Sequence, residues 1–195
     1  MSSYWPTRNG GQHANFQLEG LPGTIQHALL QFNLSSLPQS YTCVNAKLYL
    51  YLSTHDGYSG LNTGKVYSIA AANWPWIEGV GNIDIARDGE PCWNAREADG
   101  NEGVKTPWAG SAGCSTPGVD YESNPIGTWS FDVTAPIGTE IIINLDTNRV
   151  QEWFGSPNTN YGIVLIPDDD IPIAHVGSAE NPTPAYRPKL VVEYQ

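Results

Sequence analysis

The chain has 195 residues and a formal net charge of −11, and only nine of its residues are Lys or Arg. So few cations cannot form the basic clusters that bind phosphates, so neither a nucleic acid nor a membrane is an expected partner. The 40% hydrophobic content suffices for one full core, and 20 glycines and 15 prolines scattered between short apolar runs are typical of strands joined by turns. We therefore expect one domain over residues 1–195.

The start of the chain, residues 1–6, lacks the charged and apolar regions of a secretory signal peptide, and no apolar run is long enough to span a membrane. The composition nevertheless resembles that of extracellular proteins. We expect an extracellular or surface-exposed protein, either a module of a larger secreted protein or an assembly component such as a virion subunit.

Period-two alternation predicts most of the chain to be strand. In residues 46–52, alanine and leucines alternate with Lys47, Tyr49 and Tyr51, so the first set is expected to face a core and the second to face outward. The predicted strands are 13–19, 25–33, 42–53, 64–71, 92–96, 127–134, 139–145, 160–167, 174–178 and 187–194.

One short helix is predicted at residues 146–154. Asp146 is a suitable N-cap, Val150, Trp153 and Phe154 share one face, and a glycine follows. We expect this helix to close one end of a sandwich. Residues 96–124, in contrast, contain few large apolar side chains and are predicted to form a long loop, which inside a compact domain is usually functional or disordered.

A series of short motifs follows in order: LLQFNLSSLP (29–38), AKLYLY (46–51), WIEG (76–79), CWN (92–94) with Trp108 downstream, DVT (132–134), VQEW (150–153), NYG (160–162) and RPKL (187–190). Together they resemble the DNRLRE domain, named for disaggregatase-related repeats, and the related alginate-type carbohydrate-binding modules. The resemblance implies an all-β, jelly-roll-like antiparallel β-sandwich, usually attached to secreted hydrolases, lyases or surface proteins. The opening strand is truncated relative to the family, which suggests that a neighbouring domain or an identical subunit completes it.

The sequence contains no nucleophile elbow, zinc-protease helix or phosphate loop, and His13, His27, His55 and His175 are isolated from one another. We therefore expect no enzymatic activity. The acidic side chains suit Ca²⁺, which prefers oxygen ligands in loops. The candidate ligands for a structural calcium are Asp168, Asp169, Asp170, Asp120 and Glu122, and the alternative for the Asp triplet is a solvated turn.

Three cysteines, Cys43, Cys92 and Cys114, lack the short spacing of zinc ligands. Cys92 and Cys114 flank a polar, Gly-rich segment, and we predict a disulfide between them under oxidising conditions. Cys43 opens a strand and is expected to be a buried thiol.

Aromatic rings at outward or loop positions could stack on the apolar faces of sugars. The candidate ligand-binding residues are Tyr49, Tyr51, Lys47, Trp76, Trp93, Trp108 and Tyr121; packing beneath the long loop is the alternative. Trp74, Trp129, Trp153 and Phe131 lie in patterned runs and are expected in the core. The leading hypothesis is a non-catalytic module that binds a polysaccharide, and the alternative is a structural or adhesive subunit of a virion, fibre or cell surface. An acidic glycan would require Lys47, Lys65, Arg87, Arg96 and Lys105 to cluster, or a bridging calcium.

Overall fold

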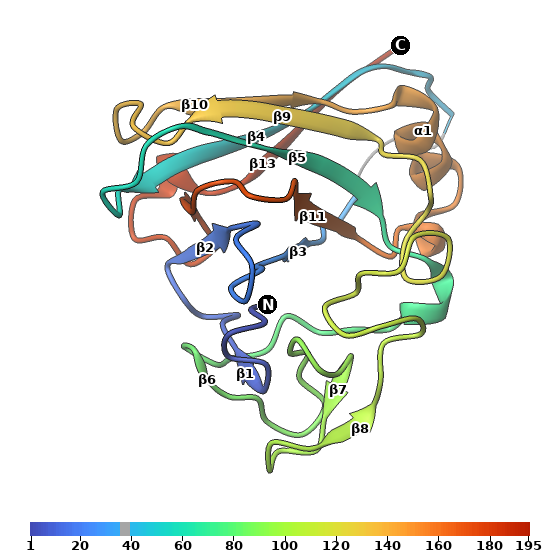
Figure 1. Cartoon of the computed structure of the whole chain (residues 1–195). Coiled ribbons are helices and arrows are strands. Elements are labelled where there is room, and N and C mark those ends of the chain that lie inside the picture. Colours follow the sequence, from blue (N-terminus) through green and yellow to red (C-terminus); the bar gives the residue numbers. More distant parts are fainter. Residues whose placement is uncertain (36–39) are drawn as a thin grey trace.

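In the computed structural model, which describes residues 1–35 and 40–195, two antiparallel sheets pack face to face (Figure 1). The first sheet has the order β10 (Glu140–Asn144), β4 (Cys43–Thr54), β12 (Ala174–Gly177) and β2 (Asn15–Leu18), and β13 (Lys189–Tyr194) also pairs with β4. The second sheet has the order β3 (Ala28–Leu30), β11 (Ile163–Pro167), β5 (Leu61–Ser68) and β9 (Gly127–Asp132). The prediction of an all-β sandwich with one short helix is therefore confirmed.

The alternation predicted for β4 is present. Ala46, Leu48, Leu50 and Leu52 are each at most 1% exposed, and the first three pack between the sheets in the main core. Each fully buried leucine contributes about 1.5–3 kcal/mol through removal of its surface from water. This row is the centre of the main core.

The four-stranded sheet contributes Trp129 to the same core, as predicted. Its Nε1 donates a hydrogen bond of 2.8 Å to Oδ1 of the fully buried Asn62 on β5. A Cβ at Gly64 would lie 2.2 Å from the Trp129 ring, so a glycine is required where this ring crosses β5. Phe131, half-buried, packs against the core rather than within it.

The predicted helix is α1 (Thr147–Gly155), and it lies at one end of the sandwich (Figure 1). The Asp146 carboxylate accepts a 2.8 Å hydrogen bond from the Asn148 N–H, which confirms the N-cap. Val150, Trp153 and Phe154 are buried against the core. No helix in the described part of the chain is long and apolar enough to cross a membrane.

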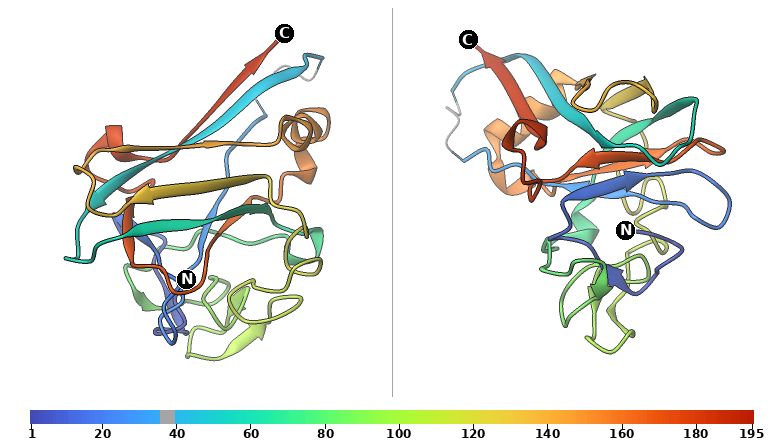
Figure 2. Two further views of the ribbon diagram at one scale, coloured as in Figure 1. Left: turned by 45° about the horizontal axis from the view of Figure 1, so that its top comes forward. Right: turned by 90° about the vertical axis from the view of Figure 1, so that its left-hand side faces the viewer.

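Residues 1–14 and 70–125 form a loop lobe beside the sandwich (Figures 1 and 2). The strand predicted at 92–96 is absent there, because the Cys92 N–H bonds to the Ala95 carbonyl in a tight turn. The lobe contains two short ladders that the pattern did not predict. They pair β1 (Arg8–Asn9) with β6 (Asp84–Ile85), and β7 (Glu97–Ala98) with β8 (Val104–Thr106). The remaining elements are the 3-10 turns η1 (Ala71–Asn73), η2 (Pro157–Thr159) and η3 (Pro184–Tyr186).

The lobe is attached to the outer face of the four-stranded sheet by a second apolar cluster. Val164 on β11 alternates with the core residues Ile163 and Leu165 and therefore faces away from the main core. Trp76 and Tyr121 from the lobe pack on it. This attachment fixes the lobe relative to the edge strands β2 and β3.

Candidate ligand-binding cavity

A cavity of about 150 Å³ lies between the loop lobe and the edge strands β2 and β3. Its walls come from the first residues of the chain, from β1, from both edge strands and from the segment that begins at Trp76. Each of these edge strands has a hydrogen-bonded neighbour on one side only, which leaves space for a cavity beside the lobe.

One buried side chain holds this wall together. Nδ2 of Asn9 donates to the carbonyls of Glu78 and Pro91, each at 3.0 Å, while its Oδ1 accepts from the N–H groups of Gly11 and Gly81 at 2.9 and 3.1 Å. All four hydrogen-bonding positions of the amide are therefore used. Gly79, with φ of 85°, passes so close that a Cβ would lie 2.6 Å from Asn9.

Two tryptophans line the cavity in different ways. Trp5 is 39% exposed, and the Arg8 guanidinium lies 5.9 Å from its ring centroid while donating 2.8 Å to the Ile83 carbonyl. Trp76 is buried, and its Nε1 donates 2.8 Å to the Tyr161 carbonyl. Trp5 is thus the accessible ring, and Arg8 holds it in place.

The polar groups of the cavity include His13, Gln17 and Glu78. Nδ1 of His13 is engaged with the Asn15 backbone, 2.7 Å from its carbonyl oxygen and 3.3 Å from its nitrogen, whereas Nε2 makes no hydrogen bond within residues 1–35 and 40–195. Partial burial, with a smaller effect from Glu180, raises the pKa of Glu78. The Glu78 carboxylate has no hydrogen-bond partner among residues 1–35 and 40–195, so it can accept from a ligand hydroxyl.

Four of the predicted ligand-binding aromatics are buried rather than outward-facing, and of these four Trp76 alone lines the cavity. Tyr51 stacks on Tyr186 at 6.4 Å, and Trp76 and Tyr121 belong to the second cluster. Trp108 donates its Nε1–H to the carbonyls of Cys92 and Trp93. Trp76, Trp108 and Tyr121 therefore pack within the loop lobe, the alternative that the sequence left open, whereas Tyr51 packs in the sandwich.

Of the three further candidates, Tyr49 and Trp93 also have partners within the protein. Lys47 and Tyr49 face outward on β4 as predicted, but the Lys189 ammonium covers the Tyr49 ring at 4.7 Å. Trp93 is half-buried against His27, with ring centroids 5.1 Å apart. In the opposite sense, Trp74, which we expected in the core, is 39% exposed.

The predicted disulfide is absent, because Cys92 and Cys114 are both free and buried. Burial raises the pKa of each thiol, so neither forms the reactive thiolate readily. The Cys114 sulfur instead lies among polar groups of Asn73 and Asp120. Cys43 is a buried thiol, as predicted.

The predicted calcium ligands do not gather into one site. Asp120 is fully buried, and its carboxylate accepts hydrogen bonds from the Asn73 amide and from the N–H groups of Gly110, Ser111 and Thr116. Burial alone would raise the pKa of Asp120, but these four donors outweigh it and the pKa is lowered.

The other acidic candidates are at or near the surface. Asp168 accepts from Lys65 and from the Thr63 hydroxyl, at 2.6 and 2.7 Å, while Asp169, Asp170 and Glu122 are exposed. Across the described ranges, no three His, Cys, Asp or Glu side chains are close enough together to hold a metal ion. A structural calcium therefore stays a prediction from the sequence.

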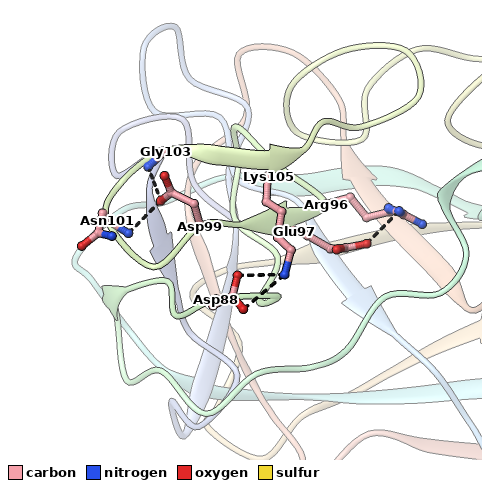
Figure 3. A network of polar contacts seen from close by, with 7 residues as sticks. All are labelled: Asp88, Arg96, Glu97, Asp99, Asn101, Gly103 and Lys105. Carbon is pink, nitrogen blue, oxygen red and sulfur yellow. Dashed lines mark hydrogen bonds and ion pairs between the residues drawn. The ribbon is translucent and has the colours of Figure 1, made fainter.

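The cations expected to attract an acidic glycan are mostly paired. Lys65 pairs with Asp168, the residue that follows β11. Figure 3 shows two more pairs around the β7–β8 ladder of the lobe, Lys105 with Asp88 at 2.9 Å and Arg96 with Glu97 at 2.8 Å. Beside them Asp99 accepts from the N–H groups of Asn101 and Gly103, which lowers the pKa of Asp99. These three cations therefore do not form the cluster that an acidic glycan would require.

A scan against models of known families and a search of curated proteins both find no match for this chain. The functional interpretation therefore depends on the cavity. Sequence reasoning did not select Trp5, Arg8, His13 or Gln17, which line this cavity. Trp5 and Arg8 precede the first predicted strand, where no alternation marks them, and the alternation of the strand at 13–19 does not show that a cavity lies beside it. The available signal was Trp5 and Arg8 three residues apart in a segment without a strand pattern.

Proposed function

We propose that the protein is a non-catalytic carbohydrate-binding module and that the cavity holds its glycan. The observation that carries the proposal is the accessible Trp5 ring, held by Arg8 and lying in the same cavity as the hydrogen-bonding groups of Gln17, His13 and Glu78. An aromatic face beside planar polar groups suits a sugar ring, which has apolar C–H faces and hydroxyls around its edge.

The size and charge of the cavity narrow the ligand. Its volume of about 150 Å³ is below the roughly 300 Å³ at which pockets for drug-sized ligands begin, so one sugar ring, at a chain end or branch, fits better than an internal stretch. Among the described residues, Arg8 is the one Lys or Arg that lines it and Glu78 the one Asp or Glu. This balance favours a neutral or mixed glycan over a polyuronate.

The same lining supports the non-catalytic part of the proposal. Glycosidases usually need two carboxyl groups that flank the scissile bond, one as acid and one as base or nucleophile. Glu78 is the one Asp or Glu that lines this cavity in the described part of the chain. Binding without cleavage, at micromolar to millimolar affinity because little surface is desolvated, is the consistent reading.

Affinity electrophoresis through gels containing neutral polysaccharides (glucomannan, galactan, dextran and xylan) tests the proposal. We expect one of them to retard the wild-type chain and the Trp5→Ala variant to migrate freely. Tyr4→Ala is the matched control, since Tyr4 is exposed, contacts Trp5 edge-on and does not line the cavity. No retardation by any glycan, together with ordered self-assembly in size-exclusion chromatography, would favour the structural or adhesive alternative instead.

A further inference from the structure

A second hollow lies at the end of the sandwich closed by α1. This groove of about 510 Å³ is bounded by the end of β5, the last turn of α1, η2 and the residue pair before β11. The groove is lined by the end of a strand, by segments that connect strands and by the lobe. Its lining includes Ser68, Glu122, Arg149 and Tyr161.

A fixed ionic group occupies one side of the groove. The Arg149 guanidinium lies 2.7 Å from the Glu152 carboxylate and 3.9 Å from that of Glu122, and all three side chains are between about a third and three-fifths exposed. Ion pairs this exposed contribute little to stability. They do place one guanidinium and two carboxylates side by side in the groove, where these groups can donate to and accept from ligand hydroxyls.

Ser68 gives an independent indication of an absent partner. It lies two residues after Val66 on the face of β5 that points between the sheets, and Ser68 is one of the residues that line the groove. The side chain is 97% buried, at 3% exposure, and its oxygen has no hydrogen-bond partner within residues 1–35 and 40–195. An unpaired buried hydroxyl lowers stability unless something else supplies the partner.

An aromatic shelf adjoins the groove. Tyr161 lines it, and the exposed Trp74 packs against Tyr161 with ring centroids 6.0 Å apart. The Tyr161 carbonyl also accepts the Nε1–H of Trp76, which lines the cavity on its other side. Trp76 therefore connects the wall of the cavity to the wall of the groove.

We propose that this groove, together with the aromatic pair at its margin, is a second saccharide-binding site. Tyr161 in the groove and Trp74 beside it form the stacking surface, and the Arg149 group is the hydrogen-bonding edge. The groove contains two carboxylates, Glu122 and Glu152, and one guanidinium, and it adjoins the C-terminal end of α1, where the helix dipole is negative. This net negative charge disfavours an anionic ligand, so the ligand proposed is a neutral sugar. The class of ligand, a saccharide, rests on the proposed function, whereas the residues that form this site are different from those that line the cavity.

Indole N–H signals in nuclear magnetic resonance spectra of the full chain separate the two sites. During titration with neutral disaccharides (cellobiose, mannobiose and maltose), we expect the signals of Trp5 and Trp74 to move with separate binding curves. Arg149→Gln should weaken binding at least fivefold in the Trp74 curve and leave the Trp5 curve unchanged. Ile77→Ala, an exposed position near Trp74 that does not line the groove, is the control and should change neither curve.

Each result decides between the sites. Movement of Trp5 alone would overturn the groove and leave the proposed function intact, whereas movement of Trp74 alone would support the groove and reject the cavity. Movement of neither would reject both. If the Arg149→Gln variant binds as tightly as wild type at Trp74, with an unchanged melting temperature, then the ionic group takes no part in binding.

Discussion

The sandwich and the loop lobe are held together by opposite kinds of buried side chain. Between the sheets, rows such as Leu48 and Leu50 exclude water with apolar surface. The lobe has an apolar cluster of its own built only from Ala86, Cys92, Ala95 and Ala98, which are small. Where the sandwich uses large apolar side chains, the lobe uses buried polar ones that hydrogen-bond to the backbone of the loops: Asn9, Asn73, Glu90 and Asp120.

Glu90 illustrates the second arrangement. Its two carboxylate oxygens accept from the N–H groups of Val80 and Arg87, at 2.7 and 2.9 Å, although the side chain is only 3% exposed. Loop backbones cannot satisfy one another as strands do, so each buried acceptor replaces part of a sheet ladder. The difference shows that an irregular region can be well fixed when its buried polar atoms are paired, and the cavity is built on such a region.

The largest expected effect is in the sandwich. Leu48→Ala should lower the free energy of unfolding by about 2–5 kcal/mol through lost burial and an unfilled cavity. Ile142→Ala, at an exposed position on the neighbouring strand β10, should cost less than about 0.5 kcal/mol. Denaturant unfolding followed by far-ultraviolet circular dichroism measures both, and equal effects would contradict the assignment of the faces.

A substitution in the lobe should act locally. Asp120→Asn replaces an acceptor by a group that presents N–H to backbone donors, and we expect a cost of about 3 kcal/mol. Hydrogen exchange should accelerate at Gly110, Ser111 and Thr116 but not in β4. Asp99→Asn is the matched control, because Asp99 also accepts from two backbone N–H groups but is exposed, and its effect should be smaller. Faster exchange throughout the sandwich would show that the two regions unfold together.

The contact between the regions should depend on pH through His27. This side chain donates from Nδ1 to the Gly113 carbonyl, and burial lowers its pKa to about 4. Between pH 6.5 and about 4 the unfolded chain therefore binds a proton that the folded chain does not, so the free energy of unfolding falls as the pH decreases, by up to about 3 kcal/mol.

The His27→Gln variant separates this titration from that of Asp120. The lowered pKa of Asp120 contributes stability that is present above pH 3.8 and is lost as the pH falls further, so it acts in a lower window. We expect the variant to have a flatter profile than wild type between pH 6.5 and 4. An unchanged slope would mean that His27 does not titrate in this way.

The smallest expected effect concerns calcium. The carboxylates of Asp120 and Asp168 already have donors within the protein. A calcium held by the exposed Asp169, Asp170 and Glu122 should raise the melting temperature only slightly, so a chelator should lower it by a small amount that added Ca²⁺ restores. A melting curve that the chelator leaves unmoved would contradict the site predicted from the sequence.

The sequence predicted the sandwich well because side-chain alternation is a direct consequence of strand geometry, as in β4, and because Asp146 has the usual chemistry of an N-cap. The sequence pattern did not predict the lobe. Asn9 there binds backbone groups 69 and 82 residues away, and Asp120 binds backbone groups within its own irregular loop. Such contacts leave no period in the sequence. Trp74 and Trp108 show the same difficulty, since composition marks a tryptophan as apolar but does not say which one the loop covers.

The most direct measurement of the central claim is the binding isotherm of Trp5→Ala beside that of Tyr4→Ala, with the glycan that retards the wild-type chain most strongly. Calorimetry should show wild-type affinity for Tyr4→Ala and an affinity at least about tenfold weaker for Trp5→Ala, which corresponds to about 1.4 kcal/mol of lost stacking. Equal affinity for both variants, with both folded, would contradict a glycan site in the cavity.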